Sequence, residues 1–309
     1  DKGYGAVQVA LPEQVLEKGA IRFRVIEARI RKIAVEGAQF HDETNIRASV
    51  PELKEGATPL LRDIATQLRA ANENPSKQTT LLMKPGEKEG VVDATIKVAD
   101  DKTQRMFVTL DNTGTRETGN YRLGVGYQHA NLFNLDHVLT LQYLTSPEKI
   151  DDVTVVGAGY RIPLYQWGDT LDIIAGYSDV TALNVQNLGI DTLGKGSNLG
   201  LRYNQFLPRV GEGYEQKLVY GLDYRACQAN VLLNGAVAQV VPDITLHPVS
   251  LTYAGTWKLR AAEIPVVPLV HVQAVGSVTD GRAAPDRRDR TRRAGPRYLR
   301  GPRGCGARH

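Results

Sequence analysis

Apolar and polar residues alternate with a period of two from about residue 104 to residue 257. Successive side chains of a β-strand point to opposite faces of the sheet, so this period predicts a long series of strands, each with one apolar face. Tyr121, Leu123 and Val125, for example, share one face, and the residues between them are Arg and Gly. Strands are expected at about residues 106–110, 121–128, 136–143, 156–162, 171–177, 198–204, 217–225 and 249–257.

Two all-β architectures fit this alternation, an antiparallel transmembrane β-barrel and a soluble β-sandwich. The barrel is favoured because the strands are about 10 residues long, the second face carries Arg, Asp, Asn and Gly, and Tyr and Trp lie near strand ends. The predicted connections also differ in length: 133–136 and 164–168 are short, whereas 146–152 and 178–196 are longer. No apolar run reaches about 18 residues, so no transmembrane helix is expected.

The first 100 residues follow a different pattern, typical of a mixed α/β module. Alternation at 20–33 and 32–35 predicts strands. Asp42 predicts the start of one helix, and Thr58 with Pro59 predicts the start of a second, because a capping hydroxyl followed by proline is favoured there. With two further strands expected at 78–83 and 91–98, the predicted order is β-α-α-β-β.

Charge is concentrated at the C-terminal end. Residues 282–309 hold ten Arg and two Asp, a net charge of +8, whereas the whole chain carries +4, which leaves −4 for residues 1–281. The body is therefore mildly acidic, and the charge does not predict nucleic-acid binding. Residues 261–309 are expected to be an irregular basic tail. It is either a disordered arm or the product of a shifted reading frame, and the second is favoured because GC-rich codons encode Arg, Gly, Pro and Ala.

No group of residues predicts an enzyme, a cofactor site or a metal site. His129 and His137 flank a predicted turn and are interpreted as interfacial or pore-facing residues. The Gly-x-Gly pairs at 124–126 and 157–159 open no helix, so they are interpreted as strand glycines and not as phosphate-binding loops. Asp111 and Asn112 are interpreted as a turn that follows a strand.

Several short motifs occur in an order that is typical of one family. They are Gly3-Tyr4, Pro12, the stretch 19–30, Lys32-Ile33-Ala34-Val35-Glu36-Gly37, Pro59-Leu60, Pro85-Gly86, Asp111-Asn112-Thr113-Gly114 and Tyr160-Arg161-Ile162-Pro163-Leu164. Together they resemble the haemolysin secretion/activation family, the two-partner secretion transporters of the POTRA-barrel superfamily. The resemblance covers about residues 1–260. The family's Val-Arg-Gly-aromatic motif and about half of its barrel are absent, so a truncated fragment is expected.

The resemblance implies a type V secretion pore of the bacterial outer membrane. Residues 1–30 would end a first POTRA domain, 31–100 would form a second one in the periplasm, and 104–260 would form the N-terminal half of the barrel, in contact with lipid. The pore would export an unfolded haemolysin- or adhesin-type partner, with no cofactor, nucleic acid or small-molecule substrate. Two other functions stay open: a POTRA-bearing factor that assembles other barrels, and a soluble β-rich binding protein.

Two sets of site residues follow from this reading. An unfolded partner would add as an extra strand to the edge strand at 78–83 beside the helix from Thr58 to Asn74. The groove would be bordered by Ile64, Leu68, Thr80 and Leu82. The pore would be lined by Arg122, Arg161, Arg202 and Arg225.

Overall fold

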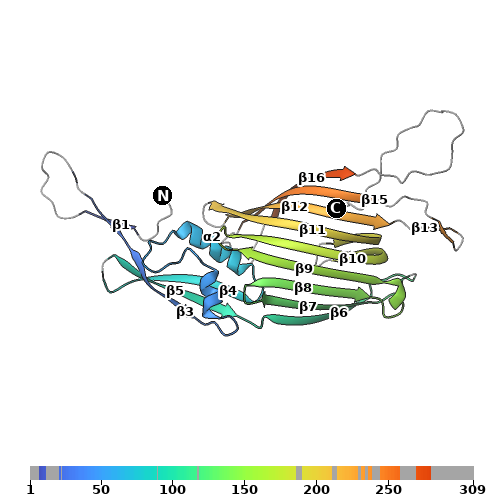
Figure 1. Cartoon of the computed structure of the whole chain (residues 1–309), viewed down its shortest axis with the longest axis horizontal. Coiled ribbons are helices and arrows are strands. Elements are labelled where there is room, and N and C mark those ends of the chain that lie inside the picture. The colour runs from blue at the N-terminus through green and yellow to red at the C-terminus, as the bar shows by residue number, and fades with distance from the viewer. Residues whose placement is uncertain are drawn as a thin grey trace, which may run out of the picture.

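The computed structural model describes residues 7–11, 21, 23–88, 90–116, 118–185, 190–210, 214–228, 231–233, 236–238, 244–257 and 269–279. In this part of the chain, a small α/β module lies at one end of a long antiparallel sheet (Figure 1). The strands of the long sheet run away from the module and back, so several of its turns lie beside the module.

The module is built around a three-stranded sheet. The hairpin of β1 (Val7–Ala10) and β2 (Arg24–Glu27) precedes it. Its elements follow as β3 (Arg29–Glu36), α1 (Glu43–Ala48), α2 (Leu61–Asn72), β4 (Lys77–Pro85) and β5 (Val91–Asp100). The strand order is β3-β5-β4, with β3 parallel and β4 antiparallel to β5. Both β3 and β4 are therefore edge strands.

Both helices begin differently from a simple capping pattern. Asp42 occupies the N-cap position of α1, as expected, but its carboxylate accepts a hydrogen bond of 2.9 Å from Nδ2 of Asn134 in the long sheet and makes no cap. The prediction that α2 starts at Thr58-Pro59 is wrong, because the helix begins at Leu61 and no side chain caps it. Pro59 is fully buried, so it packs inside the module and does not open the helix.

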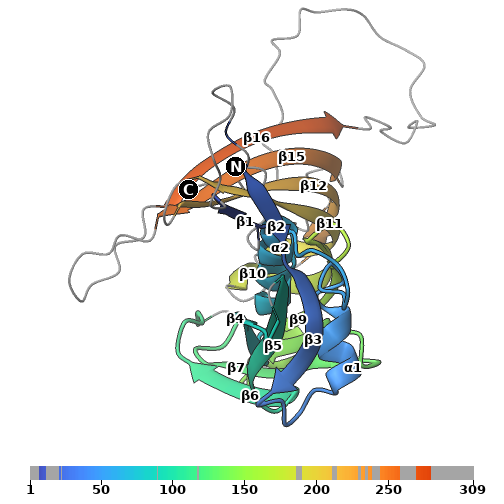
Figure 2. The ribbon, with the colours of Figure 1, turned by 90° about the vertical axis from the view of Figure 1, so that its left-hand side faces the viewer.

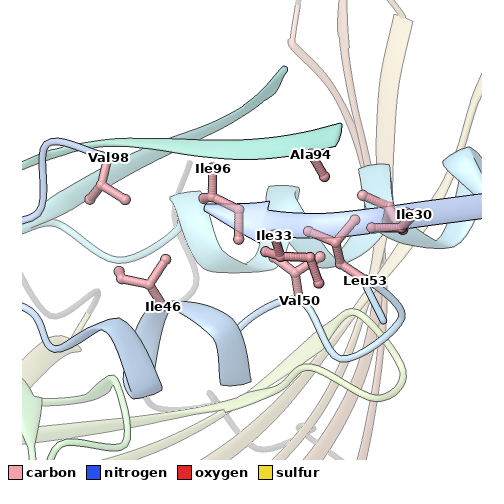
Figure 3. Packing of buried hydrophobic residues seen from close by; sticks show 9 residues of the cluster. Ile30, Ile33, Ile46, Val50, Leu53, Ala94, Ile96 and Val98 are labelled. Atoms are coloured by element: carbon pink, nitrogen blue, oxygen red, sulfur yellow. The ribbon is translucent and has the colours of Figure 1, made fainter. Parts of the chain in front are cut away.

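The apolar core of the module lies between the helices and the sheet (Figure 3). Both helices and two of the strands contribute to it, and burial of these side chains is the main favourable term in folding such a module. The buried members are Ile30, Ile33, Ile46, Val50, Leu53, Ile64, Ala94, Ile96 and Val98.

The long sheet contains nine described strands, each hydrogen-bonded to its neighbours in antiparallel fashion. They are β6 (Gln104–Asp111), β7 (Arg122–Leu132), β8 (His137–Thr145), β9 (Thr154–Leu164), β10 (Asp169–Val185), β11 (Ile190–Val210), β12 (Tyr214–Gln228), β15 (Ile244–Trp257) and β16 (Leu269–Thr279). A short hairpin of β13 (Val231–Leu233) and β14 (Ala236–Ala238) lies between β12 and β15 in the chain. All eight predicted strands are present.

Two expectations about this sheet are wrong. Residues 178–196 were expected to form a long loop, but β10 and β11 continue to pair as far as Val185 and Ile190. Strand β16 lies inside 261–309, where an irregular tail was expected, and it pairs with β15 from Leu246–Thr279 to Thr256–Leu269. In both places the backbone ladder of a neighbouring strand specifies a strand that the side-chain pattern signals only weakly. Residues 280–309 lie outside the described residues.

The sheet is curved, and Figure 2 shows it arching around the position of α2. The connections at the module end are tight: 133–136 joins β7 to β8, and 165–168 joins β9 to β10. At the opposite end, β6 and β7 are joined by residues 112–121, and β8 and β9 by residues 146–153, which include a 3₁₀ turn at Ile150–Asp152. In the described part of the chain, no helix is both long and apolar enough to cross a membrane.

The core predicts a graded response to truncation on one helix. Ile64→Ala removes a fully buried side chain of α2 and is expected to lower the free energy of unfolding of the module by about 2–5 kcal/mol. Leu61→Ala on the same helix is the control, because Leu61 is 38% exposed and its loss is expected to cost much less. Urea unfolding followed by circular dichroism at 222 nm measures both, and equal losses would contradict this core.

Candidate functional site

The two faces of the long sheet differ in chemistry. The outward face exposes large apolar and Tyr side chains on almost every described strand. A continuous exposed apolar face marks a surface that contacts lipid or another protein. Its most exposed members are Met106, Val108, Leu110, Val125, Leu141, Tyr143, Val156, Tyr177, Leu199, Leu201, Tyr220, Leu222, Tyr224, Val249 and Leu251.

The inner face, on which α2 lies, carries Gly and charged residues. Gly124 and Gly126 of β7 are strand glycines, as predicted, and they pair with Thr109 and Phe107 of β6. A Cβ added to Gly126 would lie 2.0 Å from the ring of Phe107, so this ring lies directly on the glycine. Glycine is therefore required here to let side chains of the neighbouring strand fold flat over the sheet.

Charged side chains form a ladder across four strands of the inner face. Arg161 of β9 donates to Asp172 of β10 at 2.7 Å, and Asn204 of β11 donates to the same carboxylate at 3.0 Å. One strand further, Arg202 of β11 donates to both oxygens of Asp223 of β12, at 2.7 and 2.9 Å. Arg225 lies 3.6 Å from Asp223. Arg161 and Arg202 are therefore ordered by carboxylates in cross-strand pairs, whereas Arg225 lies near a carboxylate of its own strand.

Arg122 differs from the other three predicted pore arginines. Its side chain is buried, with 2% of the residue exposed. Its guanidinium donates to the carbonyl oxygens of Thr118, Gly119 and Tyr121 and to the hydroxyl of Thr118. Arg122 therefore holds the loop before β7 in place and does not face open space. The structure brings together Arg161, Arg202 and Arg225 on one face but separates Arg122 from them.

A cavity of about 510 Å³ opens on the inner face next to the module. Both parts of the protein contribute to it: Glu73 and Pro75 come from the module, and the remaining lining comes from β6 to β10. Arg161 links the two parts, since it lies 3.4 Å from Glu73 as well as binding Asp172. The lining from the sheet includes Phe107, Gln128, Thr140, Gln142, Tyr160 and Asp172.

The groove predicted for a partner segment is not formed by the four residues assigned to it. Ile64 is fully buried in the module core, and Leu68 packs against that core. Thr80 and Leu82 are exposed on the opposite face of β4. The physical reason is the period of the strand: even-numbered positions of β4 point to solvent, while Thr79, Leu81 and Met83 face the helices.

The free edge of β4 exposes backbone hydrogen-bonding groups. The side chain of Asn72 binds the backbone of Thr79 on this edge, because its Oδ1 accepts from the N–H and its Nδ2 donates to the C=O. The backbone groups of Thr79 therefore point away from β5. Since this direction repeats every second residue, the N–H and C=O of Leu81 and Met83 point to the free edge as well.

A buried polar cluster joins the module to the sheet, and the sequence analysis missed it. The ammonium group of Lys77 at the start of β4 binds the carboxylate of Asp136 in the β7–β8 turn, with both side chains almost fully buried. Tyr165 in the β9–β10 turn donates to the same carboxylate at 2.6 Å. Burial lowers the pKa of Lys77 even though Asp136 favours its charged form, and burial with Asp136 raises the pKa of Tyr165. Lys77 and Asp136 are 59 residues apart, so no local pattern signals the pair.

A Ser-His-Asp arrangement occurs inside this cluster. Nδ1 of His41 lies 3.1 Å from Asp100, and its Nε2 lies 3.3 Å from the hydroxyl of Ser76. All three side chains are buried, and the hydroxyl of Ser76 also lies 2.9 Å from Oδ1 of Asn74. A nucleophile needs an open approach for its substrate, so this arrangement is structural in character. Within the described ranges, no three His, Cys, Asp or Glu side chains gather as metal ligands.

Helix α2 contacts the module end of the sheet directly. Arg69 donates to the carbonyl oxygen of Leu207 at 3.0 Å, and its guanidinium lies 5.9 Å from the centre of the Phe206 ring. Thr66 lies against Gly168, because a Cβ added to Gly168 would lie only 2.4 Å from the methyl group of Thr66. The helix therefore lies against the ends of β9, β10 and β11, on the inner side of the sheet.

Comparison with known proteins gives one family. The sequence model of "Haemolysin secretion/activation protein ShlB/FhaC/HecB" matches residues 90–247, about half of the chain. The match begins at the end of the module and covers the long sheet as far as the early part of β15.

Curated relatives match about half of the chain. Outer membrane transporter CdiB of Dickeya dadantii is 28% identical over 168 residues, which are 54% of this chain and 29% of that protein. Heme/hemopexin transporter protein HuxB of Haemophilus influenzae is 24% identical over 147 residues, 47% of this chain and 26% of that protein. The match thus spans less than a third of the length of these relatives.

Solved structures share the fold. CdiB from Escherichia coli superposes with a TM-score of 0.64 at 23% identity, over 84% of this chain and 47% of that one. CdiB from Acinetobacter baumannii gives a TM-score of 0.65 at 16% identity, over 90% of this chain and 51% of that one. The described module and long sheet therefore share the overall fold of these structures, and this chain spans about half of them.

The buried carboxylate of Asp100 predicts a pH-dependent stability. Burial alone would raise the pKa of Asp100, but hydrogen bonds from Phe40, Gln39 and His41 outweigh it and hold the pKa below its ordinary value. A carboxyl with a lower pKa in the folded state stabilises the fold above its unfolded pKa of about 3.9, and this stability is lost as the pH falls through the folded value.

We therefore expect Asp100→Asn to lower the free energy of unfolding of the module at pH 7 by about 1–3 kcal/mol, because buried N–H groups lose a charged acceptor. The difference from the unsubstituted protein is expected to shrink at about pH 3, below the unfolded pKa. Asp101→Asn is the matched control, since the neighbouring Asp101 is mostly exposed. Urea titrations at the two pH values measure this, and a pH-independent difference would contradict it.

Proposed function

Because this chain belongs to the haemolysin secretion/activation protein family ShlB/FhaC/HecB, we propose that it is the periplasmic module and part of the membrane-spanning sheet of a two-partner secretion pore. The pore lies in the bacterial outer membrane and exports a secreted protein across it. The observation that carries the proposal is the long antiparallel sheet with an apolar outward face, an inner face of Gly and charged residues, and a module at one end.

The module is a POTRA domain of about residues 31–100 in this proposal. The element order from β3 to β5 and the strand order β3-β5-β4 support it. The hairpin of β1 and β2 ends a preceding POTRA domain within 1–30, and residues 104–260 belong to the barrel. The module lies in the periplasm, since the tight turns at 133–136 and 165–168 are on its side and periplasmic turns of such barrels are short.

The outward face contacts lipid. Backbone N–H and C=O groups in hydrocarbon must find hydrogen-bond partners within the protein. The antiparallel ladder of the long sheet supplies these partners for every strand that has a neighbour on both sides. The apolar and Tyr side chains of that face replace water with lipid contacts. A soluble β-rich protein would leave this whole face in water, and for this reason we favour the membrane protein.

The exported partner passes along the inner face in an unfolded form. Arg161, Arg202 and Arg225 keep this face polar. Because carboxylates lie beside them, the face has no large electrostatic potential of one sign that would bind a passing charged segment tightly. The glycines let side chains of neighbouring strands, such as Phe107, lie flat on this face. The relatives are described as transporters, and a haemolysin- or adhesin-type protein is the class of partner that the family implies.

The partner first binds at the edge of β4, as an added strand. The outward backbone groups of Leu81 and Met83 would supply the hydrogen bonds, and the exposed Thr80 and Leu82 would contact the partner's side chains. Ile64 and Leu68 contribute only by holding the helix behind this edge.

The location in the membrane is tested by two neighbouring residues of β8. Leu141→Arg places a charge on the lipid face and is expected to reduce insertion into lipid vesicles, because such a charge costs about 2–4 kcal/mol near the middle of the bilayer. Thr140→Arg places the same charge on the inner face and is expected to leave insertion nearly unchanged. The fraction of protein protected from protease in the vesicles is measured, and equal insertion of the two variants would argue against a lipid-facing surface.

Export is tested at the β4 edge. Leu81→Pro removes a backbone N–H that points to the free edge, whereas Leu81→Ala keeps it. In cells that lack the unsubstituted gene, the proline variant is expected to leave most of the partner in the periplasm, and the alanine variant to export it. The partner in the medium is quantified against cells with the gene deleted. Unchanged partner levels after deletion would sink the export function, and normal export by the proline variant would sink only the edge site.

A further inference from the structure

We propose that Lys77 and Asp136 are positioning residues of the pore, whose buried ion pair holds the module in the one orientation that places α2 beside the inner face. The inference rests on the proposed export function. It assigns a role to a contact that lies outside both the charged ladder and the β4 edge.

The pair is buried to an unusual degree. The side chains of Lys77 and Asp136 are 0% and 1% exposed, and they bind each other directly. Lys77 also donates to Oδ1 of Asn45 at 3.3 Å, and Asp136 accepts from Tyr165. An ion pair inside a protein is costly to break from one side, because the remaining charge is left without water and without its partner.

The cluster around this pair draws on both parts of the protein. The module supplies side chains from the loop before α1, from α1, and from the segment between α2 and β4. The sheet supplies the β7–β8 and β9–β10 turns. Asn45 donates to the carbonyl oxygen of Asn134, and Asn74 donates to that of Ala130 at 2.6 Å.

The residues of this cluster belong to neither part's own folding core. The apolar core of the module consists of aliphatic side chains, and neither Lys77 nor any Asn is among them. The strands of the sheet are held by their backbone ladders. Weakening the pair is therefore expected to release one folded part from the other rather than to unfold either.

The β7–β8 turn is shaped to present Asp136 to the module. Phe133, Asn134 and Asp136 all have positive φ angles, of 58° to 60°, a conformation that is unfavourable for non-glycine residues. Oδ1 of Asn131 accepts the N–H of Asp136 at 3.0 Å, and Asp42 of the module accepts from Asn134. Contacts with the module thus hold a turn that the chain would not favour alone.

A second ion pair between the two parts is more exposed. Arg161 and Glu73, which join the ladder to the end of α2, are each about one-third exposed, at 35% and 33%. Half-exposed ion pairs contribute little to stability. The buried pair is thus the strongest electrostatic link among those described, and it determines where α2 and Pro75 lie relative to the cavity on the inner face.

This placement matters for export because the cavity is lined from both parts. If the module tilts away, Glu73 and Pro75 leave the cavity, and the start of β4 loses its contact with the β7–β8 turn. A partner segment bound at the edge would then have no continuous path to the ladder.

The first experiment measures the orientation. Spin labels at Lys97→Cys in the module and Trp167→Cys in the β9–β10 turn, with Cys227→Ser and Cys305→Ser, report one distance distribution in the full chain. Lys77→Met and Asp136→Leu are each expected to broaden and shift this distribution. The double variant is expected to restore a narrow distribution, because two apolar groups can replace a buried ion pair.

Two further variants keep the result interpretable. Lys84→Met removes an exposed charge from the same strand and is expected to leave the distribution unchanged. Tyr165→Phe removes only one hydrogen bond to Asp136, and it is expected to broaden the distribution slightly if the larger changes prevent folding. Narrow, unshifted distributions in Tyr165→Phe and in whichever single variants fold would overturn the proposal.

The second experiment measures export by the same variants. Each single variant is expected to lower the partner in the medium at least about tenfold, since an uncompensated buried charge costs more than the 1.4 kcal/mol that this factor requires. The double variant is expected to recover export. If the unsubstituted protein exports nothing, the proposed function fails. If it exports, and the single variants shift the module without reducing export, only the positioning role is overturned.

Discussion

The antiparallel hydrogen-bond ladder of the long sheet is the constraint on which the rest of the structure depends. In the proposed pore the outward face meets lipid, where no water satisfies the backbone, so each strand inside the sheet has to bond to both of its neighbours along its length. Once the ladder is formed, the period of two assigns every side chain to one of two faces. The apolar outward face and the polar inner face both follow from this single arrangement.

Ion pairs differ in burial between the inner face and the junction of the sheet with the module. On the inner face, Arg161 and Arg202 are paired with carboxylates on the next strand, which lets a wide polar surface stay ordered next to solvent. At the junction, Lys77 and Asp136 are removed from solvent altogether. The first kind of pair sets the character of a surface, whereas the second kind fixes the relative position of two folded parts, because only the second is costly to separate.

The module lies at one end of the strands and so distinguishes the two ends of the sheet. Helix α2 contacts the ends of β9, β10 and β11, and strand β4 lies at the same end of the protein (Figure 1). A partner segment that binds the module would meet the inner face next, and the apolar surface of the sheet would remain in lipid. The family relationship supports the proposal that this geometry serves as a route for export.

The sequence by itself determined the strands of the sheet, because alternation records which face of a strand is apolar and needs no knowledge of neighbours. It also predicted two helices and the strands β3, β4 and β5 of the module, but not β1, and it predicted the shared face of Arg161, Arg202 and Arg225. It did not reveal β16, which lies within the stretch that was assigned to the tail and which pairs with β15.

Only the tertiary structure decided the contacts between residues far apart in the chain. It showed that Pro59 is buried and does not start α2, and that the guanidinium of Arg122 donates its hydrogen bonds to carbonyl oxygens of the loop before β7. It also showed that Ile64 and Leu82 lie on opposite sides of β4. Above all it joined Lys77 to Asp136. Lys77 and Asp136 each have the local sequence pattern of a surface or turn position. Their burial arises only when the module and the sheet exclude water between them.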